Sequence, residues 1–109
     1  MEIIKNRKVI GKGKLCDDAV SQTIGLMFSK SEKILIFKFP DKKMSIHTFF
    51  CYYPLDLVYL SGGKVIEICE NLKTYSHFKP KNKASFLIEA PSGFVKNNQI
   101  QEGSILQLR

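Results

Sequence analysis

The sequence contains no tryptophan, only two arginines, and no apolar run long enough to cross a membrane. Its longest apolar stretch, Phe49 to Leu60, is interrupted by Pro54 and Asp56 and falls short of the roughly 20 residues that a membrane-spanning helix needs. The first residues, Met1 to Lys14, are rich in basic side chains and lack the continuous apolar core of a signal peptide. We therefore expect a cytoplasmic protein without a membrane span.

Cysteine is also scarce. Cys16, Cys51 and Cys69 are odd in number, far apart in the sequence, and form no Cys-x-x-Cys pair of the kind found in zinc and redox sites. We predict free thiols in a reducing compartment, with Cys51 and Cys69 serving as packing residues inside apolar strands.

Motifs of the common catalytic and cofactor sites are absent as well. The sequence has no phosphate-binding glycine loop, no Gly-x-Ser-x-Gly elbow and no His-Glu-x-x-His pattern. Its two histidines, His47 and His77, are separated by thirty positions, which is weak support for a metal site. The sequence therefore predicts no cofactor and no metal.

What the sequence does contain is a series of short, β-branched or aromatic stretches separated by turn residues. Its 109 residues suit one domain with a single core. Such strands at this spacing are typical of a mainly β, compact antiparallel sandwich or barrel-like domain, here with one or two short helices. The six strand candidates are Ile34–Phe39, Ser45–Cys51, Leu55–Leu60, Lys64–Cys69, Ala84–Ala90 and Ser104–Leu108.

The remaining local signals predict two helices, one tight hairpin, and near the start of the sequence an interrupted strand or a hairpin. Apolar residues at helical spacing indicate an amphipathic helix over Asp17–Phe28, and Pro91–Asn98 is suited to a second short helix. Ser61-Gly62-Gly63-Lys64 provides the positive-φ residues of a tight hairpin turn between the third and fourth strand candidates. Apolar pairs near Ile3 and Ile10 flank a basic stretch and indicate an interrupted strand or hairpin.

Polar residues set within apolar strands are the candidates for a functional site. Strand alternation places His47 on one face with Ser45, and because both faces of this strand contain apolar residues, His47 is expected to be at least partly buried. Asp56 is embedded among large apolar residues, where an isolated carboxylate is costly. Its partners would be backbone N–H groups of the Tyr53–Pro54 turn, a cation, or His47.

Glu89 is the fourth candidate. It precedes Pro91-Ser92-Gly93, where a carboxylate is favourable at the start of the predicted helix, so a capping role and a role in the site are both open.

These residues leave more than one function open. We favour a non-catalytic binding or accessory domain with a pocket near residues 45–56, in which His47, Asp56, Ser45 and Glu89 contact a small molecule or a partner segment. The alternative is a hydrolase-like enzyme with His47 as base, oriented by Asp56. The same two residues also suit a purely structural role, fixing the corner between two strands.

The net charge of +7 raises nucleic acid as a third partner class. The stretch from Lys73 to Lys83 interleaves aromatic and basic residues as a single-strand binding surface does, and its candidates are Tyr75, His77, Phe78, Lys79 and Lys81. The positive charge is nearly all lysine and is spread over several segments, which equally fits an ordinary solvated surface. RNA binding is therefore not the favoured hypothesis.

A series of short motifs runs in order from about Val20 to the end: Gly25-Leu26-Met27-Phe28, Ile36 to Pro40, Ile46 to Phe50, Pro54-Leu55-Asp56, Gly63-Lys64-Val65, Ala84 to Pro91 with Gly93, and Gly103. This series resembles the domain of unknown function 192 family. Similarity to that family implies a compact β-sandwich or barrel-like domain with no established activity. The chain resembles the shorter, archaeal-type version, in which His47 stands where bacterial members have a Trp-Met-Lys-Asn-Thr-like stretch.

Overall fold

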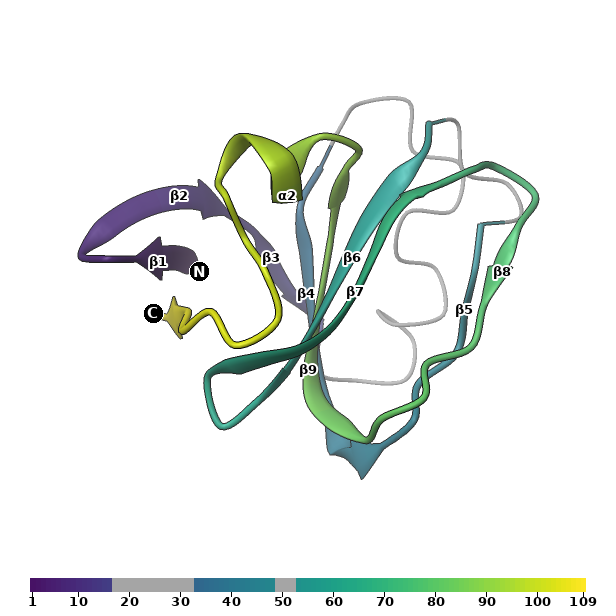
Figure 1. Cartoon of the computed structure of the whole chain (residues 1–109), viewed down its shortest axis with the longest axis horizontal. Helices are drawn as coiled ribbons and strands as arrows, with labels where there is room; N and C mark the ends of the chain where they lie inside the picture. The colour runs from purple at the N-terminus through teal and green to yellow at the C-terminus, as the bar shows by residue number, and fades with distance from the viewer. Residues whose placement is uncertain (17–32, 49–52) are drawn as a thin grey trace.

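A computed structural model describes residues 1–16, 33–48 and 53–109 of the chain (Figure 1). The described part is mainly β, as predicted, and contains one short helix. In chain order its elements are β1 (Glu2–Lys5), β2 (Lys8–Lys12), β3 (Lys14–Cys16), β4 (Leu35–Lys42), β5 (Ile46–His47), β6 (Leu55–Ser61), β7 (Lys64–Leu72), β8 (His77–Phe78), β9 (Ala84–Pro91), α2 (Phe94–Asn97) and β10 (Gln107–Leu108).

The strands form three sheets. A five-stranded sheet with the order β3-β4-β9-β6-β7 is flanked by a three-stranded sheet, β10-β1-β2, and a two-stranded sheet, β5-β8. Figure 1 shows the five-stranded sheet between the other two, with α2 on the side of β1 and β2. Because β10 pairs with β1, the two ends of the chain lie side by side. The fold is thus a layered arrangement of sheets, and the described strands do not close into a barrel.

Two tight hairpins follow from turn chemistry. Gly62 and Gly63 have φ values of 59° and 79°, and they join β6 and β7 at the turn predicted from the sequence. Asn6 and Arg7, with φ values of 52° and 66°, do the same between β1 and β2. Positive φ at both central residues gives the turn a twist that matches the flanking antiparallel strands. The predicted hairpin at Gly62-Gly63 is confirmed, and of the two alternatives for the first residues the structure shows the hairpin.

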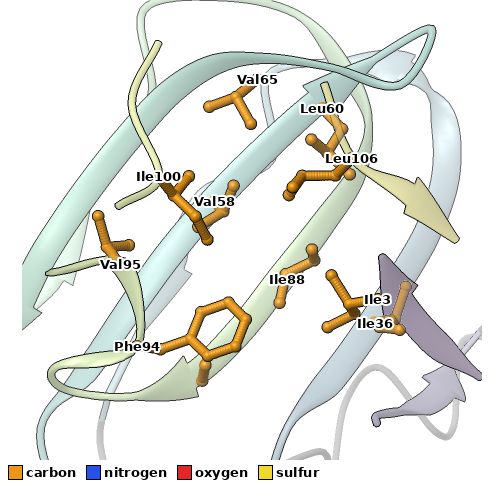
Figure 2. Close-up of a cluster of buried hydrophobic side chains, with 11 residues drawn as sticks. Ile3, Ile36, Val58, Leu60, Val65, Ile88, Phe94, Val95, Ile100 and Leu106 are labelled. Atoms are coloured by element: carbon orange, nitrogen blue, oxygen red, sulfur yellow. The ribbon is translucent and has the colours of Figure 1, made fainter. Parts of the chain in front are cut away.

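The face of the five-stranded sheet that meets α2 carries an apolar cluster, which we call the α2 face. Figure 2 shows its side chains converging from the central strands, α2 and the two ends of the chain. Burying an aliphatic side chain of this kind contributes about 1.5–3 kcal/mol, so this cluster is a main source of stability. Its buried members are Ile3, Ile36, Val58, Leu60, Val65, Ile88, Ala90, Phe94, Val95, Ile100 and Leu106.

The opposite face, which we call the β8 face, carries a second cluster. Alternation along β4, β6 and β9 sends every other residue to this side, where side chains of β5 and β8 also pack. Its buried members are Cys16, Leu35, Phe37, Phe39, Leu55, Leu57, Tyr59, Ala84 and Leu87, with Met44, Ile46, Cys69 and Phe78 among those partly buried against them. The central sheet is therefore covered on both sides.

Three predictions of local structure need comment. The predicted strand Ser45–Cys51 is described only as far as Thr48, and within that part only Ile46–His47 pairs as a strand. The predicted helix Asp17–Phe28 lies outside the described residues. The pair β3–β4 is parallel, although an antiparallel fold was predicted; a parallel pair needs a long crossover connection, and residues 17–32, which join these strands, lie outside the described residues.

The second predicted helix is confirmed as α2, but it is shorter than Pro91–Asn98. No helix among the described residues is long and apolar enough to cross a membrane.

Candidate functional site

Asp56 lies in β6 with 1% of its surface exposed. Its Oδ1 accepts a hydrogen bond from the Asn71 N–H (2.8 Å), and its Oδ2 accepts two, from the N–H groups of Gly93 (3.1 Å) and Val95 (2.9 Å). The donors belong to the end of β7 and to the first turn of α2. Asp56 therefore ties three segments together, and its carboxylate is satisfied by backbone donors.

The backbone around Asn71 shows why a carboxylate stands there. Between the cross-strand pairs that flank it, β7 has one residue more than β6, and Asn71 adopts a φ of 55°. Such a bulge takes an N–H out of the ladder, and Asp56 accepts it. The Ser92 hydroxyl donates to Asn71 Oδ1 (2.9 Å) and the Ser92 N–H to the Pro54 carbonyl (3.1 Å) at the same corner. Of the three predicted kinds of partner, backbone N–H groups are the kind observed, but the donors are those of Asn71, Gly93 and Val95 and not those of the Tyr53–Pro54 turn.

His47 does not join Asp56. His47 is exposed in β5, and the three bonds to the Asp56 carboxylate all come from backbone N–H groups. The expectation that His47 is partly buried is wrong: among the described strands β5 pairs with β8 alone, and the side of β5 that carries His47 is exposed. Ser45, just before β5, is exposed as well. The described structure therefore does not assemble the acid–base pair of the hydrolase hypothesis.

Asp56 and Glu89 lie on opposite faces of the sheet. In the β6–β9 ladder Asp56 stands opposite Ala90, a member of the α2 face, whereas Glu89 stands opposite Leu57, a member of the β8 face. Adjacent residues of a strand point to opposite sides, which separates the two carboxyl groups. The prediction that Glu89 caps the following helix is wrong, because Asp56 accepts the N–H groups at the start of α2.

Glu67, in β7, is a second buried carboxylate that the described structure satisfies fully. Its side chain, 8% exposed, accepts the Lys81 N–H at both oxygens (3.0 Å each), and its Oε1 accepts the Asn82 N–H (2.9 Å) and the Asn82 side-chain amide (2.9 Å). Glu67 thereby fixes the loop between β8 and β9. The sequence analysis missed this residue, although an acidic residue between Ile66 and Ile68 is the same signal that drew attention to Asp56.

Glu89 differs from the other two buried acids. It is 5% exposed, lies in β9 between Leu35 of β4 and Leu57 of β6, and receives no hydrogen bond from any described residue. Among the described residues, every side-chain oxygen that is fully shielded from solvent has a hydrogen-bond partner. Because the Glu89 oxygens have none, they must retain a little contact with solvent. Burial raises the pKa of Glu89 from 4.5 to about 8, because the charged form is poorly solvated there. Glu89 is therefore mostly a neutral acid at pH 7.

Two further polar groups share the β8 face with Glu89. The Tyr59 hydroxyl donates to the Met44 carbonyl (2.8 Å), and burial together with the charges of Glu89 and Glu67 raises the pKa of Tyr59 far above its usual range. Burial also raises the pKa of the Cys69 thiol, with Asp56 and Glu67 contributing. At neutral pH Tyr59 and Cys69 are uncharged and Glu89 is mostly so, and these three groups therefore place neutral polar atoms in an apolar setting.

The candidate nucleic-acid residues between Lys73 and Lys83 differ in exposure. Tyr75 is 71% exposed, and His77, Lys79 and Lys81 are exposed too, as a nucleic-acid surface would require. Phe78 is partly buried, however, and its ring lies 6.0 Å from that of Tyr59 on the β8 face. One of the two aromatic rings proposed for base stacking is thus part of the packing.

A polar concavity of about 250 Å³ lies elsewhere, between the β1–β2 turn and the residues after α2. It contains none of the predicted site residues. Its lining is Lys5, Asn6, Lys8, Ile10, Asn97, Asn98 and Gln99. Within the described ranges, no group of three or more His, Cys, Asp or Glu side chains is placed to hold a metal ion.

Comparison with known proteins gives a family and a fold. The DUF192 family, described as "Uncharacterized ACR", matches residues 3–108. A UPF0127 protein of Pyrococcus furiosus is 24% identical and covers 98% of this chain and 95% of its own length; one of Pyrococcus horikoshii is 32% identical, with 85% and 84% covered. A protein of unknown function from Novosphingobium aromaticivorans has a crystal structure that aligns with a TM-score of 0.81 at 19% identity, covering 88% of this chain and 74% of that one.

Proposed function

This chain belongs to the DUF192 family, whose function is unknown, and we propose that it is a small non-catalytic ligand-binding domain in which the ligand contacts the Glu89 carboxyl on the β8 face. The observation that carries the proposal is the contrast among its buried acids. Asp56 accepts three hydrogen bonds and Glu67 accepts four, whereas no described residue donates one to Glu89.

The buried carboxyl group of Glu89 is costly for folding. Leaving a polar group buried without a partner costs about 1–3 kcal/mol, so an aliphatic side chain at position 89 would stabilise the fold more than Glu89 does. Folding alone gives no reason for Glu89 between Leu35 and Leu57. A ligand that supplies the missing partner recovers this free energy when it binds, and the residual solvent contact of the carboxyl oxygens offers a path to it.

The surroundings define the chemistry of the ligand. A carboxyl group with a pKa near 8 is protonated at neutral pH, so it donates one hydrogen bond and accepts others. Its neighbours across the ladder, Leu35 and Leu57, are apolar. A ligand with an apolar body and one neutral hydrogen-bonding group, such as a carbonyl, amide or hydroxyl, complements this environment.

This proposal moves the binding position away from the segment 45–56. His47 and Ser45 are exposed on the outer side of β5, whereas Met44 and Ile46 pack against the β8 face. Asp56 then acts as a framework residue that holds the corner of the sheet. We further propose that residues 1–109 act as one domain in the cytoplasm, a location that fits the free thiol of Cys69.

The test is a thermal-shift screen of small metabolites against the wild type, Glu89→Leu and Glu70→Leu. Glu89→Leu removes both the donor and the acceptor and should fold, because its surroundings are apolar; Glu70 lies exposed on β7 and provides the matched control. We expect compounds that raise the melting temperature of the wild type and of Glu70→Leu but not that of Glu89→Leu. A library that gives no shift, or shifts that persist in Glu89→Leu, would contradict the proposal.

A further inference from the structure

The two histidines of the chain meet across the small sheet. In the antiparallel pair β5–β8, His47 and His77 are direct cross-strand partners. In the sequence, thirty positions separate the two residues, which is weak support for a metal site. The separation is irrelevant once β8 returns alongside β5.

The hydrogen-bond pattern tells which kind of cross-strand pair this is. The Thr48 N–H donates to the Ser76 carbonyl (2.8 Å), so the pair formed by residues 48 and 76 is a hydrogen-bonded one. Pair types alternate along an antiparallel ladder, which makes His47 and His77 a non-hydrogen-bonded pair. Side chains approach each other most closely in such pairs, with Cβ atoms about 4.5–5.5 Å apart.

Both imidazoles project away from the packed interior. Their strand neighbours, Ile46 and Phe78, pack against the β8 face, so alternation directs His47 and His77 to the outer side, and both are exposed. The backbone beneath them is held firmly. Thr48 is fully buried, and its hydroxyl donates to the Lys73 carbonyl and accepts the Ser76 N–H (2.8 Å).

We propose that His47 and His77 form a two-imidazole binding site for a divalent transition-metal ion of the nickel, copper or zinc type. Imidazole nitrogen is a preferred ligand of these ions, and two rings held side by side chelate one ion without rearrangement of the backbone. Since no third protein donor is grouped with them among the described residues, water or a small exogenous molecule completes the coordination.

The positive net charge of the chain bears on which metal ions can bind. A net charge of +7 repels cations in general, although salt screens this repulsion beyond about 8 Å at physiological ionic strength. Binding must therefore come from the metal–nitrogen bonds. Magnesium and calcium, which prefer oxygen ligands, should not bind at this pair.

The experiment titrates protein free of any affinity tag with Ni²⁺ by calorimetry, because Ni²⁺ prefers nitrogen ligands and does not oxidise the cysteine thiols as Cu²⁺ does. The variants are His47→Gln, His77→Gln and the control Ser45→Ala, which alters an exposed residue just before β5. We expect one Ni²⁺ per chain in the wild type and in Ser45→Ala, and an affinity at least about tenfold lower in each histidine variant. Mg²⁺ should give no heat of binding.

Three results would overturn the proposal: no binding of Ni²⁺ to the wild type, binding that survives either histidine substitution, or one ion shared between two chains, as detected by the mass of the complex in ultracentrifugation. Circular dichroism checks that the variants fold. Independently of any variant, Zn²⁺ added to the wild type should shift the imidazole NMR signals of both His47 and His77, and a shift of only one ring would also refute the site.

Discussion

The two faces of the five-stranded sheet are both packed, but they carry different kinds of residue. On the α2 face the cluster is apolar, and the carboxylate of Asp56 accepts hydrogen bonds from three backbone N–H groups. On the β8 face the polar groups of Glu67, Glu89, Tyr59 and Cys69 stand among leucines and phenylalanines. The α2 face is explained by folding, whereas Glu89 on the β8 face is not. Single substitutions of the three buried acids, Asp56, Glu67 and Glu89, test this difference between the faces.

The largest effect is expected at Asp56. Asp56→Ala leaves the N–H groups of Asn71, Gly93 and Val95 without a partner in a buried corner, and we expect a loss of about 3–5 kcal/mol in the free energy of unfolding, measured by urea denaturation. Asp56→Asn keeps one acceptor oxygen and should lose less. A change below about 1 kcal/mol in Asp56→Ala would show that the corner does not depend on this carboxylate.

A smaller effect is expected at Glu67, because its donors lie in a surface loop that water reaches when the bond is lost. Glu67→Ala should cost about 2 kcal/mol and accelerate hydrogen exchange at the N–H groups of Lys81 and Asn82. The control Glu70→Ala, on the same strand but exposed, should change stability by less than about 0.5 kcal/mol. Unchanged hydrogen exchange at Lys81 and Asn82 would show that Glu67 does not fix the loop between β8 and β9.

Glu89 should behave in the opposite way. Burial raises its pKa in the folded state from 4.5 to about 8, so its contribution to stability is fully present below about pH 4.5 and is lost as the pH rises towards 8. Glu89→Gln cannot ionise and escapes this loss. Its unfolding free energy relative to the wild type should therefore rise with pH between about 5 and 8, by at most about 1.4 kcal/mol per pH unit.

The measurement is a set of urea denaturation curves at pH 5, 6.5 and 8 for the wild type, Glu89→Gln and the exposed control Glu70→Gln. The control should run parallel to the wild type. If Glu89→Gln also runs parallel, Glu89 is ionised in the folded protein and must have a counter-charge or donors, and the contrast between the two faces fails.

Features that depend only on residues adjacent in the sequence could be predicted. The hairpin at Gly62-Gly63 needs only two residues that tolerate positive φ, and it formed as predicted. The need of Asp56 for a partner was also predicted, with backbone N–H groups as one of three alternatives. Its actual donors, Asn71, Gly93 and Val95, were not, because they depend on a bulge in β7 and on the approach of β9 to β6, both of which are set by tertiary pairing.

The errors at His47 and Glu89 share one cause. Alternation shows which residues share a side of a strand, but it does not show what covers that side. His47 was expected inside and is exposed, since β5 lies in a small outer sheet. Glu89 was placed near the start of α2 by its sequence position, yet the pleat turns it to the opposite face from that helix. The pairing of His47 with His77 likewise emerges only from the register of β5 with β8.

The pairing of β1 with β10 has a consequence for how fast this part of the core forms when the chain refolds. Glu2 and Arg109 exchange backbone hydrogen bonds, 2.6 Å and 2.9 Å long, and Ile3 stands opposite Leu108. β1 and β10 are far apart in the sequence, and contacts of such high sequence separation form slowly. Until Leu106 and Leu108 have reached the cluster, Ile3 has no complete core to enter. We therefore expect the side chain of Ile3 to be buried late when the chain refolds.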